Sequence, residues 1–290
     1  MFRTRGEKVY RVFNTAFLLC FSLIMLAPMW HVAMLSLSDA TKAFGGGFYL
    51  VPKGFSLNSY KTVLSNPNII SAYANTVFVV VVGTMINVVM TYLAAYPLSI
   101  KGLRGKKFIN YFIYLTMLFS GGLIPFYMVV RGLGMIDSLW SLIIPTACGG
   151  YYVFVLRNFI NTIPASLFES ARIDGASELT ILTKITIPLS LPSLAVISLM
   201  YGVGNWNSWF NCIIFINDYS KYTLQPILRQ ILFKVQIQDF FNQTAGVSVG
   251  QTPEVVKMAT VMAATIPILV IYPFFQKYFV KGMMLGAVRE

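Results

Sequence analysis

The fold is decided by residues 70–98, which read ISAYANTVFVVVVGTMINVVMTYLAAYPL. No Asp, Glu, Lys or Arg occurs in this run, and the charge-free stretch around it extends from Thr62 to Ile100. A transmembrane α-helix needs about 20 apolar residues, because each residue advances about 1.5 Å along the helix axis. The apolar residues here are continuous, whereas strands of a membrane barrel alternate over about 10 residues. Residues 70–98 therefore predict a helix that crosses a membrane.

Five further stretches of the chain are free of charged residues. They are Val12–Ser38, Phe108–Val130, Ser138–Leu156, Ile185–Asn217 and Met258–Gln276. We expect each stretch to hold one helix of the length that a bilayer requires. The expected spans lie over about 12–37, 70–98, 108–130, 138–157, 188–214 and 256–277. The chain is thus predicted to be an all-α, polytopic membrane protein, with six transmembrane helices in one transmembrane domain over residues 1–290.

The composition excludes a water-soluble globule. Hydrophobic residue types make up 57% of the 290 residues and charged types 11%, and the mean hydropathy is +0.69. A soluble domain carries about 25% charged residues, which cover its surface. The net charge of +12 could point to nucleic acid, but its distribution along the chain fits membrane orientation better. We therefore expect a lipid bilayer as the surroundings and no nucleic-acid partner.

The Lys and Arg residues set the expected orientation, because cytoplasmic loops of membrane proteins carry an excess of both. With the N-terminus in the cytoplasm, 14 of the 22 Lys and Arg residues lie on the cytoplasmic side. Both termini are therefore predicted to be cytoplasmic, with outer loops over about 38–68 and 218–254 and a long inner loop over about 158–187. The first apolar stretch is too long for the roughly 7–15 apolar residues of a signal peptide, so we expect it to remain as the first helix.

The residues that catalytic or metal sites require are scarce. The chain has one histidine, His31, and its three cysteines form no Cys-x-x-Cys pair. We therefore expect no metal site, no catalytic residue and no Walker-type phosphate loop, and hence no cofactor on this chain. The expected spans also hold almost no Asp, Glu, Arg or His, which ion-coupled carriers use to bind the coupling ion. Energy for transport is thus predicted to enter from outside the bilayer.

The 158–187 loop carries charges of both signs, and residues 165–176 of it read ASLFESARIDGA. Pro164 suits the start of a helix, Gly175 suits the left-handed turn that ends one, and Ser177 can cap a second helix. The loop is therefore predicted to form a helix–turn–helix elbow on the inner membrane face. The apolar side chains that it offers to a partner are Leu167, Phe168 and Ile173.

One spacing in this loop resembles a known family. Glu169-Ser170-Ala171 is followed by three residues, Gly175, nine residues and Ile185-x-Ile187-Pro188. The pattern is similar to the EAA loop of ABC importer permeases, E-A-A-x3-G-x9-I-x-L-P, from which Ser170 and Ile187 depart. Other segments resemble the carbohydrate, MalG-like branch of these binding-protein-dependent permeases: Asn75-Thr76, Ala94-Ala95-Tyr96, Arg157-Asn158-Phe159, Trp206-Asn207 and Lys281-Gly282. Within that branch the chain looks closest to the second permease of oligosaccharide and polysaccharide importers, such as the alginate importer.

The resemblance implies a type I ABC importer permease in the bacterial cytoplasmic (inner) membrane. It implies a heterodimer with a second, homologous permease, two ATP-binding subunits that hold ATP and Mg, and an external solute-binding protein that delivers a sugar or oligosaccharide. In the family, the EAA loop forms a coupling helix that sits in a cleft of an ATPase subunit. The positions that match this role are Glu169, Ser170, Ala171, Asp174, Gly175, Ala176 and Pro188.

A path for a sugar must offer hydrogen bonds without a buried charge. The candidate residues are amides and indoles of two expected spans: Asn75, Asn87, Asn205, Trp206, Asn207, Trp209 and Asn211. The same amides can instead join neighbouring helices, and the tryptophans can anchor at the membrane interface. Both interpretations stay open.

Other functions remain as alternatives. An ABC import permease for a non-sugar solute would share the EAA spacing. An ion-coupled secondary sugar carrier, or a channel, would need no ATP. An intramembrane enzyme would need a cluster of acids or histidines, which the expected spans lack.

Overall fold

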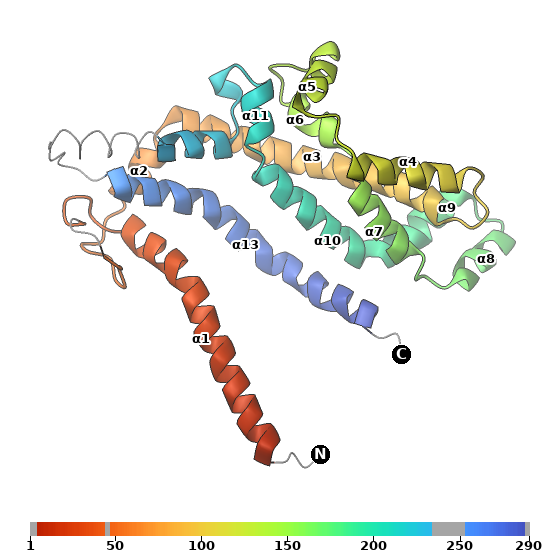
Figure 1. Ribbon diagram of the computed structural model, residues 1–290, viewed down its shortest axis with the longest axis horizontal. Coiled ribbons are helices and arrows are strands. Elements are labelled where there is room, and N and C mark those ends of the chain that lie inside the picture. Colours follow the sequence, from red (N-terminus) through yellow and green to blue (C-terminus); the bar gives the residue numbers. More distant parts are fainter. Residues whose placement is uncertain (1–4, 44–46, 234–252, 288–290) are drawn as a thin grey trace. The chain divides into compact units, whose positions relative to one another are not determined.

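The described part of the chain is mostly α-helical (Figure 1). The computed structural model of the protein describes residues 5–43, 47–233 and 253–287. Within these residues, strand-like pairing is limited to an isolated bridge between Ser38 and Phe55. The all-α class expected from the charge-free stretches is therefore confirmed.

The chain divides into two compact units. The first comprises Met1–Ile69 and Leu228–Ile266, and the second comprises Ile70–Ile227 and Pro267–Glu290. The helices that lie in or begin in the first unit are α1 (Arg5–Ser36), α2 (Asn58–Leu64), α3 (Pro67–Ser99) and α13 (Pro253–Ala287). The other named α-helices belong to the second unit: α4 (Lys106–Leu118), α5 (Leu123–Gly132), α6 (Trp140–Ile143), α7 (Gly150–Ile160), α8 (Ala165–Ile173), α9 (Glu178–Ile181), α10 (Ile187–Trp206) and α11 (Phe210–Phe215).

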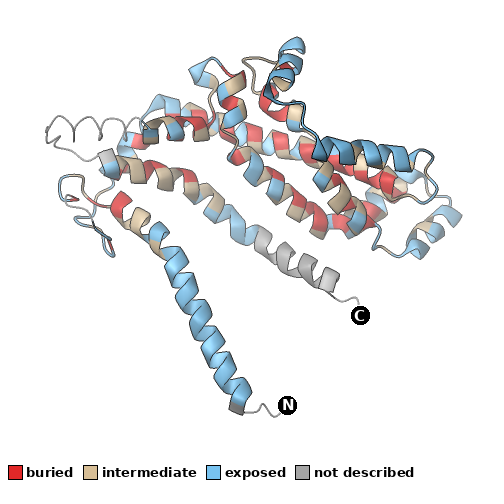
Figure 2. Ribbon diagram, in the orientation of Figure 1, coloured by how far each residue is buried: buried red, intermediate tan, exposed pale blue. Residues whose placement is uncertain are grey.

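In the first unit, α1 is apolar along most of its length and almost none of it is buried (Figure 2). In its most apolar window only 6% of the residues are buried, as is typical of a helix that faces lipid or another membrane protein. The end of α1 carries a small core, where Leu35 packs with Ala43, Tyr49 and Val255. Beside it, the backbone N–H of Tyr49 donates to Nδ1 of His31 over 3.1 Å. His31 is thus a hydrogen-bonded packing residue.

The described residues of the second unit form two hydrophobic cores, and α3 contributes to both. One core joins α3 to α7 and α10 and contains Tyr92, Ala95, Tyr96, Leu98, Val153, Leu156, Ile160, Leu194, Ile197 and Tyr201. The other lies toward the start of α3 and contains Val79, Val130, Leu142, Ile143, Cys212, Phe215 and Ile216. Because α3 takes part in both cores, it is the helix against which the remaining segments of this unit are positioned.

Among the described residues, four helical segments are long and apolar enough to cross a membrane, and six if each of two bent helix pairs is one span. The first bent pair is α4 with α5, at 116°. The helix expected over 108–130 is therefore not straight, because Phe119 is extended and Gly122 has a φ of +85°. The second pair bends by 51° between Thr146 and Gly150, within the span expected over 138–157.

The span expected over 188–214 both begins and ends earlier than predicted. Helix α9, a π-helical turn over Leu182–Thr186 and α10 form one helical segment, Glu178–Trp206. The final part of the expected 158–187 loop is thus the foot of this segment, and α11 follows it as a separate short helix. A helix occurs over 224–233 within the expected outer loop 218–254, and residues 234–252 of that loop lie outside the described residues.

Candidate functional site

Helix α8 ends in a turn that depends on Gly175. The N–H of Gly175 donates to the carbonyl of Arg172 over 3.1 Å, and the N–H of Ala176 donates to the carbonyl of Ala171 over 2.9 Å. These two bonds form a Schellman turn, in which one residue takes the left-handed conformation. Gly175 is that residue, with a φ of +78°. Apart from its two chain neighbours, a Cβ at this position would meet no atom of the described residues within 4 Å, so the left-handed backbone conformation, rather than a lack of space, favours glycine.

The second arm of the elbow begins at Ser177, as predicted. The Oγ of Ser177 accepts a hydrogen bond from the backbone N–H of Thr180 over 3.2 Å and so caps α9. The helix then runs through the π-helical turn Leu182–Thr186 and has Pro188 in the first turn of α10. The second arm of the elbow is therefore continuous with a helix long enough to cross a membrane.

Helix α8 packs little against the other described parts of the chain. None of its residues is buried, and Ile173 is 85% exposed. Of the predicted coupling positions, the exposed ones are Glu169, Ser170, Asp174, Gly175 and Pro188, and the half-buried ones are Ala171 and Ala176. Exposed apolar side chains beside small ones are typical of a surface that another protein covers.

Behind α8 lies a cavity of about 410 Å³. Tyr96 and Lys101 line it from the end of α3 and the loop that follows, and Phe168 and Arg172 line it from α8. Helix α8 therefore stands apart from α3 across a hollow.

One carboxylate joins α8, α9 and α3 beside this cavity. Oε1 of Glu178 accepts a hydrogen bond from Nε of Arg172 over 3.0 Å, and the same oxygen lies 3.0 Å from the terminal nitrogen of that guanidinium. Oε2 of Glu178 accepts from the hydroxyl of Tyr96 over 2.7 Å. We call these three residues the Glu178 bridge. The spacing that identified the loop gave no sign of it, because Tyr96 lies 82 residues before Glu178.

Two of the predicted path residues bind each other. Nδ2 of Asn205 donates to Oδ1 of Asn87 over 3.1 Å and to Oγ1 of Thr84 over 3.3 Å. Nδ2 of Asn87 donates to the carbonyl of Thr146 over 2.6 Å. Asn87 is 1% exposed. In this conformation the two amides join α3, α10 and the turn that precedes α7.

The other predicted path residues lie at separate places in the second unit. Asn75 donates to the carbonyls of Ser220 and Tyr222, over 2.9 and 3.0 Å. Trp206 is buried and its Nε1 has no hydrogen-bond partner among the described residues. Asn207 is exposed, and Trp209 and Asn211 are half-buried. The structure therefore brings Asn87 and Asn205 together but does not place all seven residues on one surface.

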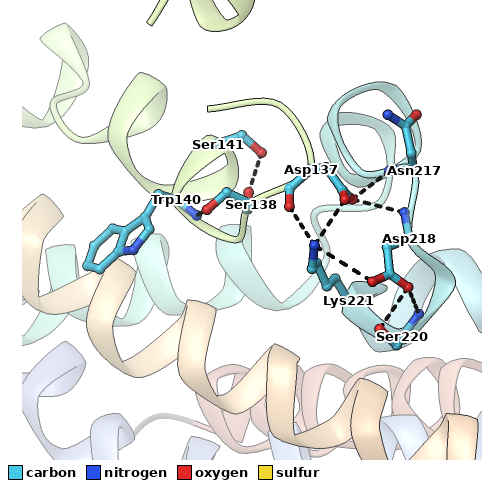
Figure 3. Close-up of polar contacts among 8 residues, drawn as sticks. All are labelled: Asp137, Ser138, Trp140, Ser141, Asn217, Asp218, Ser220 and Lys221. Carbon is cyan, nitrogen blue, oxygen red and sulfur yellow. Dashed lines mark hydrogen bonds and ion pairs between the residues drawn. The ribbon is translucent and has the colours of Figure 1, made fainter. Parts of the chain in front are cut away.

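A polar cluster ties two loops of the second unit together (Figure 3). Oδ1 of Asp137 accepts the backbone N–H groups of Asn217 and Asp218, over 3.1 and 2.9 Å, and Oδ2 accepts from Nζ of Lys221 over 2.9 Å. Asp137 has a φ of +61°, which residues with a Cβ seldom adopt. The bonds of its carboxylate therefore hold a backbone conformation that is unfavourable by itself.

The same contacts shift two pKa values. The backbone N–H of Asp218, followed by the Lys221 ammonium, holds the pKa of Asp137 below its ordinary value. The hydrogen bond to Asp137 raises the pKa of Lys221. A lowered carboxyl pKa contributes stability above the ordinary Asp value and loses it as pH falls, whereas a raised Lys pKa loses its contribution as pH rises.

We expect this cluster to be intact from about pH 4 to about pH 10, between the ordinary pKa values of Asp and Lys. Asp137→Asn keeps an acceptor oxygen and tolerates positive φ, but it removes the charge. Thermal unfolding of the solubilised protein should give a lower Tm for this variant, with a difference that is constant between about pH 5 and pH 9 and vanishes as Asp137 becomes protonated at lower pH. A difference that changes within the neutral range would contradict the role assigned to Asp137.

The described residues offer surfaces and hollows on which a partner or a solute can bind. They contain no three His, Cys, Asp or Glu side chains gathered so as to hold a metal ion. A second hollow of about 290 Å³ is lined mainly by apolar side chains of α3, α10 and α13, with Thr84, Gly202 and Trp206 among them.

Comparison with known proteins gives the following likenesses. No family model matches the chain. The chain is 41% identical over 283 residues to the polygalacturonan/rhamnogalacturonan transport system permease protein YtcP of Bacillus subtilis (strain 168), with 98% of this chain and 99% of that protein covered. A solved structure of a bacterial ABC transporter involved in the import of the acidic polysaccharide alginate matches at a TM-score of 0.86 and 31% identity, over 96% of this chain and 99% of that chain. A chain of a bacterial alginate ABC transporter, in complex with an alginate pentasaccharide-bound periplasmic protein, shares the fold at a TM-score of 0.58 and 15% identity, over 94% of this chain and 96% of that chain.

Proposed function

The chain belongs to the family of ABC transporter sugar permeases, and we propose that it is one of two membrane-spanning subunits of an ATP-driven oligosaccharide importer. Membership in this family confirms the resemblance drawn from the spacing between Glu169 and Pro188. In this proposal the chain carries no catalytic residue and no cofactor. ATP and Mg are bound and ATP is hydrolysed on two partner subunits.

The observation that carries this proposal is the construction of α8. The helix has no buried residue, its end is fixed by the turn at Gly175, and it leads into the helical segment that ends at Trp206. A short helix that packs so little on its own chain has a surface free for another protein. We propose that an ATPase subunit covers it, through Glu169, Ser170, Ala171, Asp174, Gly175 and Ala176, with Pro188 opening the helix that receives the movement.

Apolar contact is expected to supply most of the affinity for the ATPase subunit. Ile173 is 85% exposed and Leu167 is 44% exposed on α8, and burial of such side chains yields about 25 cal/mol for each Å² of apolar surface before the entropic cost of association is subtracted. An exposed ion pair made by Glu169 contributes only about 0–1 kcal/mol. Glu169 is therefore expected to orient the contact rather than to strengthen it greatly.

The names of the relatives support a substrate class. One relative is named for polygalacturonan and rhamnogalacturonan, and the solved structure is described as importing the acidic polysaccharide alginate. All three polymers contain uronic acids. We therefore propose a uronic-acid-containing oligosaccharide as the solute, with the neutral amide and indole side chains named from the sequence as candidate path residues.

The proposed setting is the bacterial cytoplasmic membrane, spanned six times, with both termini and the 158–187 loop in the cytoplasm. The distribution of Lys and Arg supports this orientation. Six spans agree with the number of apolar helical segments in the described residues when each bent pair is one span. The proposed partners are a second homologous permease, two ATP-binding subunits and an external solute-binding protein.

Reconstitution of the whole complex tests this function. The chain is co-purified with its partner permease and ATPase subunits and placed in liposomes that contain ATP, with the binding protein outside. We expect uptake of tritiated oligogalacturonides or alginate oligosaccharides that stops when ATP is omitted or vanadate is added. We also expect uptake to continue when ionophores collapse proton and sodium gradients. Accumulation of the sugar by this chain alone, driven by an ion gradient, would show instead a secondary carrier.

A further inference from the structure

The Glu178 bridge is anchored firmly at one end. Tyr96 is 8% exposed and belongs to the core that joins α3 to α7 and α10. Its ring is therefore fixed by packing, and its hydroxyl presents a fixed donor to Glu178. The other donor, Arg172, lies in the last turn of α8, next to the turn made by Gly175.

The Glu178 bridge connects α8 to α3, which close packing of side chains does not. Helix α8 has no buried residue and stands apart from α3 across the cavity of about 410 Å³. Among the described side chains of α8, Arg172 is the one joined to α3 by hydrogen bonds, through the Glu178 carboxylate. A displacement of α8 can therefore reach α3 through this carboxylate, without being transmitted by close-packed side chains.

Glu178 also has a position of its own in the second arm of the elbow. It is the first residue of the helical segment Glu178–Trp206, directly after the cap Ser177. Its carboxylate is thus bound to Tyr96 near the end of α3, while its backbone begins the segment that contains α10. The Glu178 side chain can therefore link a displacement of α8 to both α3 and α10.

We propose that Glu178 is a positioning residue that couples displacement of α8 to α3 and α10 during transport. This proposal rests on the proposed function, since it requires an ATPase subunit that moves α8. The side chains of Glu178 and Arg172 are 55% and 44% exposed, and such exposed pairs add little to folding stability. Loss of the bridge is therefore expected to affect transport more than assembly.

The test uses the complete transporter in liposomes and measures two quantities, ATP hydrolysed and labelled oligosaccharide taken up. In Glu178→Gln, we expect the ATPase subunits to co-purify as in the wild type and ATP hydrolysis to persist. Uptake per ATP should fall by about tenfold, as expected when one hydrogen bond to a charged group is lost. Tyr96→Phe, which removes a single hydroxyl, should lower the same ratio, and it decides the question if Glu178→Gln does not assemble.

A double variant shows whether Tyr96 and Arg172 act through the same carboxylate or affect transport independently of each other. If Tyr96 and Arg172 act through one carboxylate, Tyr96→Phe combined with Arg172→Gln should lower uptake per ATP no further than the more severe single variant. The matched control is Tyr92→Phe, one helical turn earlier in the same core, because it removes a buried hydroxyl that is not part of the Glu178 bridge. This control should keep the wild-type ratio.

The possible outcomes distinguish the inference from the function on which it rests. An unchanged ratio of uptake to ATP in Tyr96→Phe, with a wild type that transports, would overturn the role of the bridge and leave the proposed function standing. Additive losses of uptake per ATP in the double variant would likewise overturn the role of the bridge and leave the proposed function standing. A wild-type complex without ATP-driven uptake would overturn the proposed function and, with it, this inference.

Discussion

Replacement of Gly175 by valine is expected to lower ATP-driven uptake by about tenfold or more, because the left-handed conformation costs a residue with a Cβ roughly 1–2 kcal/mol and a β-branched residue more. At a φ of +78°, valine would disfavour the turn that ends α8. The N–H groups of Gly175 and Ala176 would then lose their acceptors at the end of the helix. Co-purification of the ATPase subunits and uptake by the reconstituted complex measure the effect.

Two further substitutions identify why glycine is needed at this position. Asn tolerates positive φ but is bulky, whereas Ala is small but disfavours positive φ. Because a Cβ at Gly175, apart from its two chain neighbours, meets no atom of the described residues within 4 Å, a backbone requirement predicts that Gly175→Asn retains more uptake than Gly175→Ala. The opposite order would show that close approach of the ATPase subunit sets the requirement. Wild-type docking and transport in Gly175→Val would remove the elbow from the proposed mechanism.

Phe215→Ala is expected to lower the free energy of unfolding by about 3–5 kcal/mol, the usual effect of removing a buried phenylalanine ring. Phe215 is 0% exposed and lies in the core toward the start of α3. Its ring centroid is 5.5 Å from that of Phe126 and 6.2 Å from that of Tyr127, both on α5. Removing the ring would leave a cavity between α5 and α11. Denaturation midpoints of the solubilised complex, or recovery of folded protein after heating, measure the loss.

The control for this prediction lies on the same short helix. Phe210 is 47% exposed, so Phe210→Ala removes an equal number of atoms without opening a buried cavity. Its effect on the midpoint should be a small fraction of that of Phe215→Ala. Equal effects of the two substitutions would mean that the core around Phe215 does not stabilise the second unit.

The elbow could be predicted in detail because its signals are local. The turn at Gly175 and the cap at Ser177 both depend on residues within about one helical turn, and both occur where the sequence places them. The prediction was less accurate at the start of α8, where Pro164 precedes the first helical residue instead of occupying it. It also ended the loop too late, because the helix capped by Ser177 continues without a break into the span that ends at Trp206.

The bends could not be predicted from hydrophobicity, since a charge-free stretch has the same composition whether its helix is straight or broken. A signal was nevertheless present in the third stretch. Ser120-Gly121-Gly122, followed by Pro125, combines residues that favour turns with one that cannot donate in a helix. The structure bends there by 116°.

Contacts between residues that are far apart in the sequence could not be predicted from the spacing of motifs. Asn87 and Asn205 could be identified as polar residues in apolar spans, but their pairing depends on how α3 and α10 rotate against each other. The Glu178 bridge joins residues from three separate segments. Such contacts follow from packing, which one sequence alone does not specify.

The π-helical turn at Leu182–Thr186 has a consequence for the angular phase of α10. A π turn accommodates one residue more than an α-helical turn in the same length of helix. Deleting one residue there would therefore restore regular α-helix and leave the direction of Asn205 toward Asn87 nearly unchanged. Deleting one residue between Thr186 and Asn205 would instead rotate Asn205 by about 100° relative to α9 and turn it away from Asn87. The helix thus tolerates the loss of a residue in its π turn but not within α10.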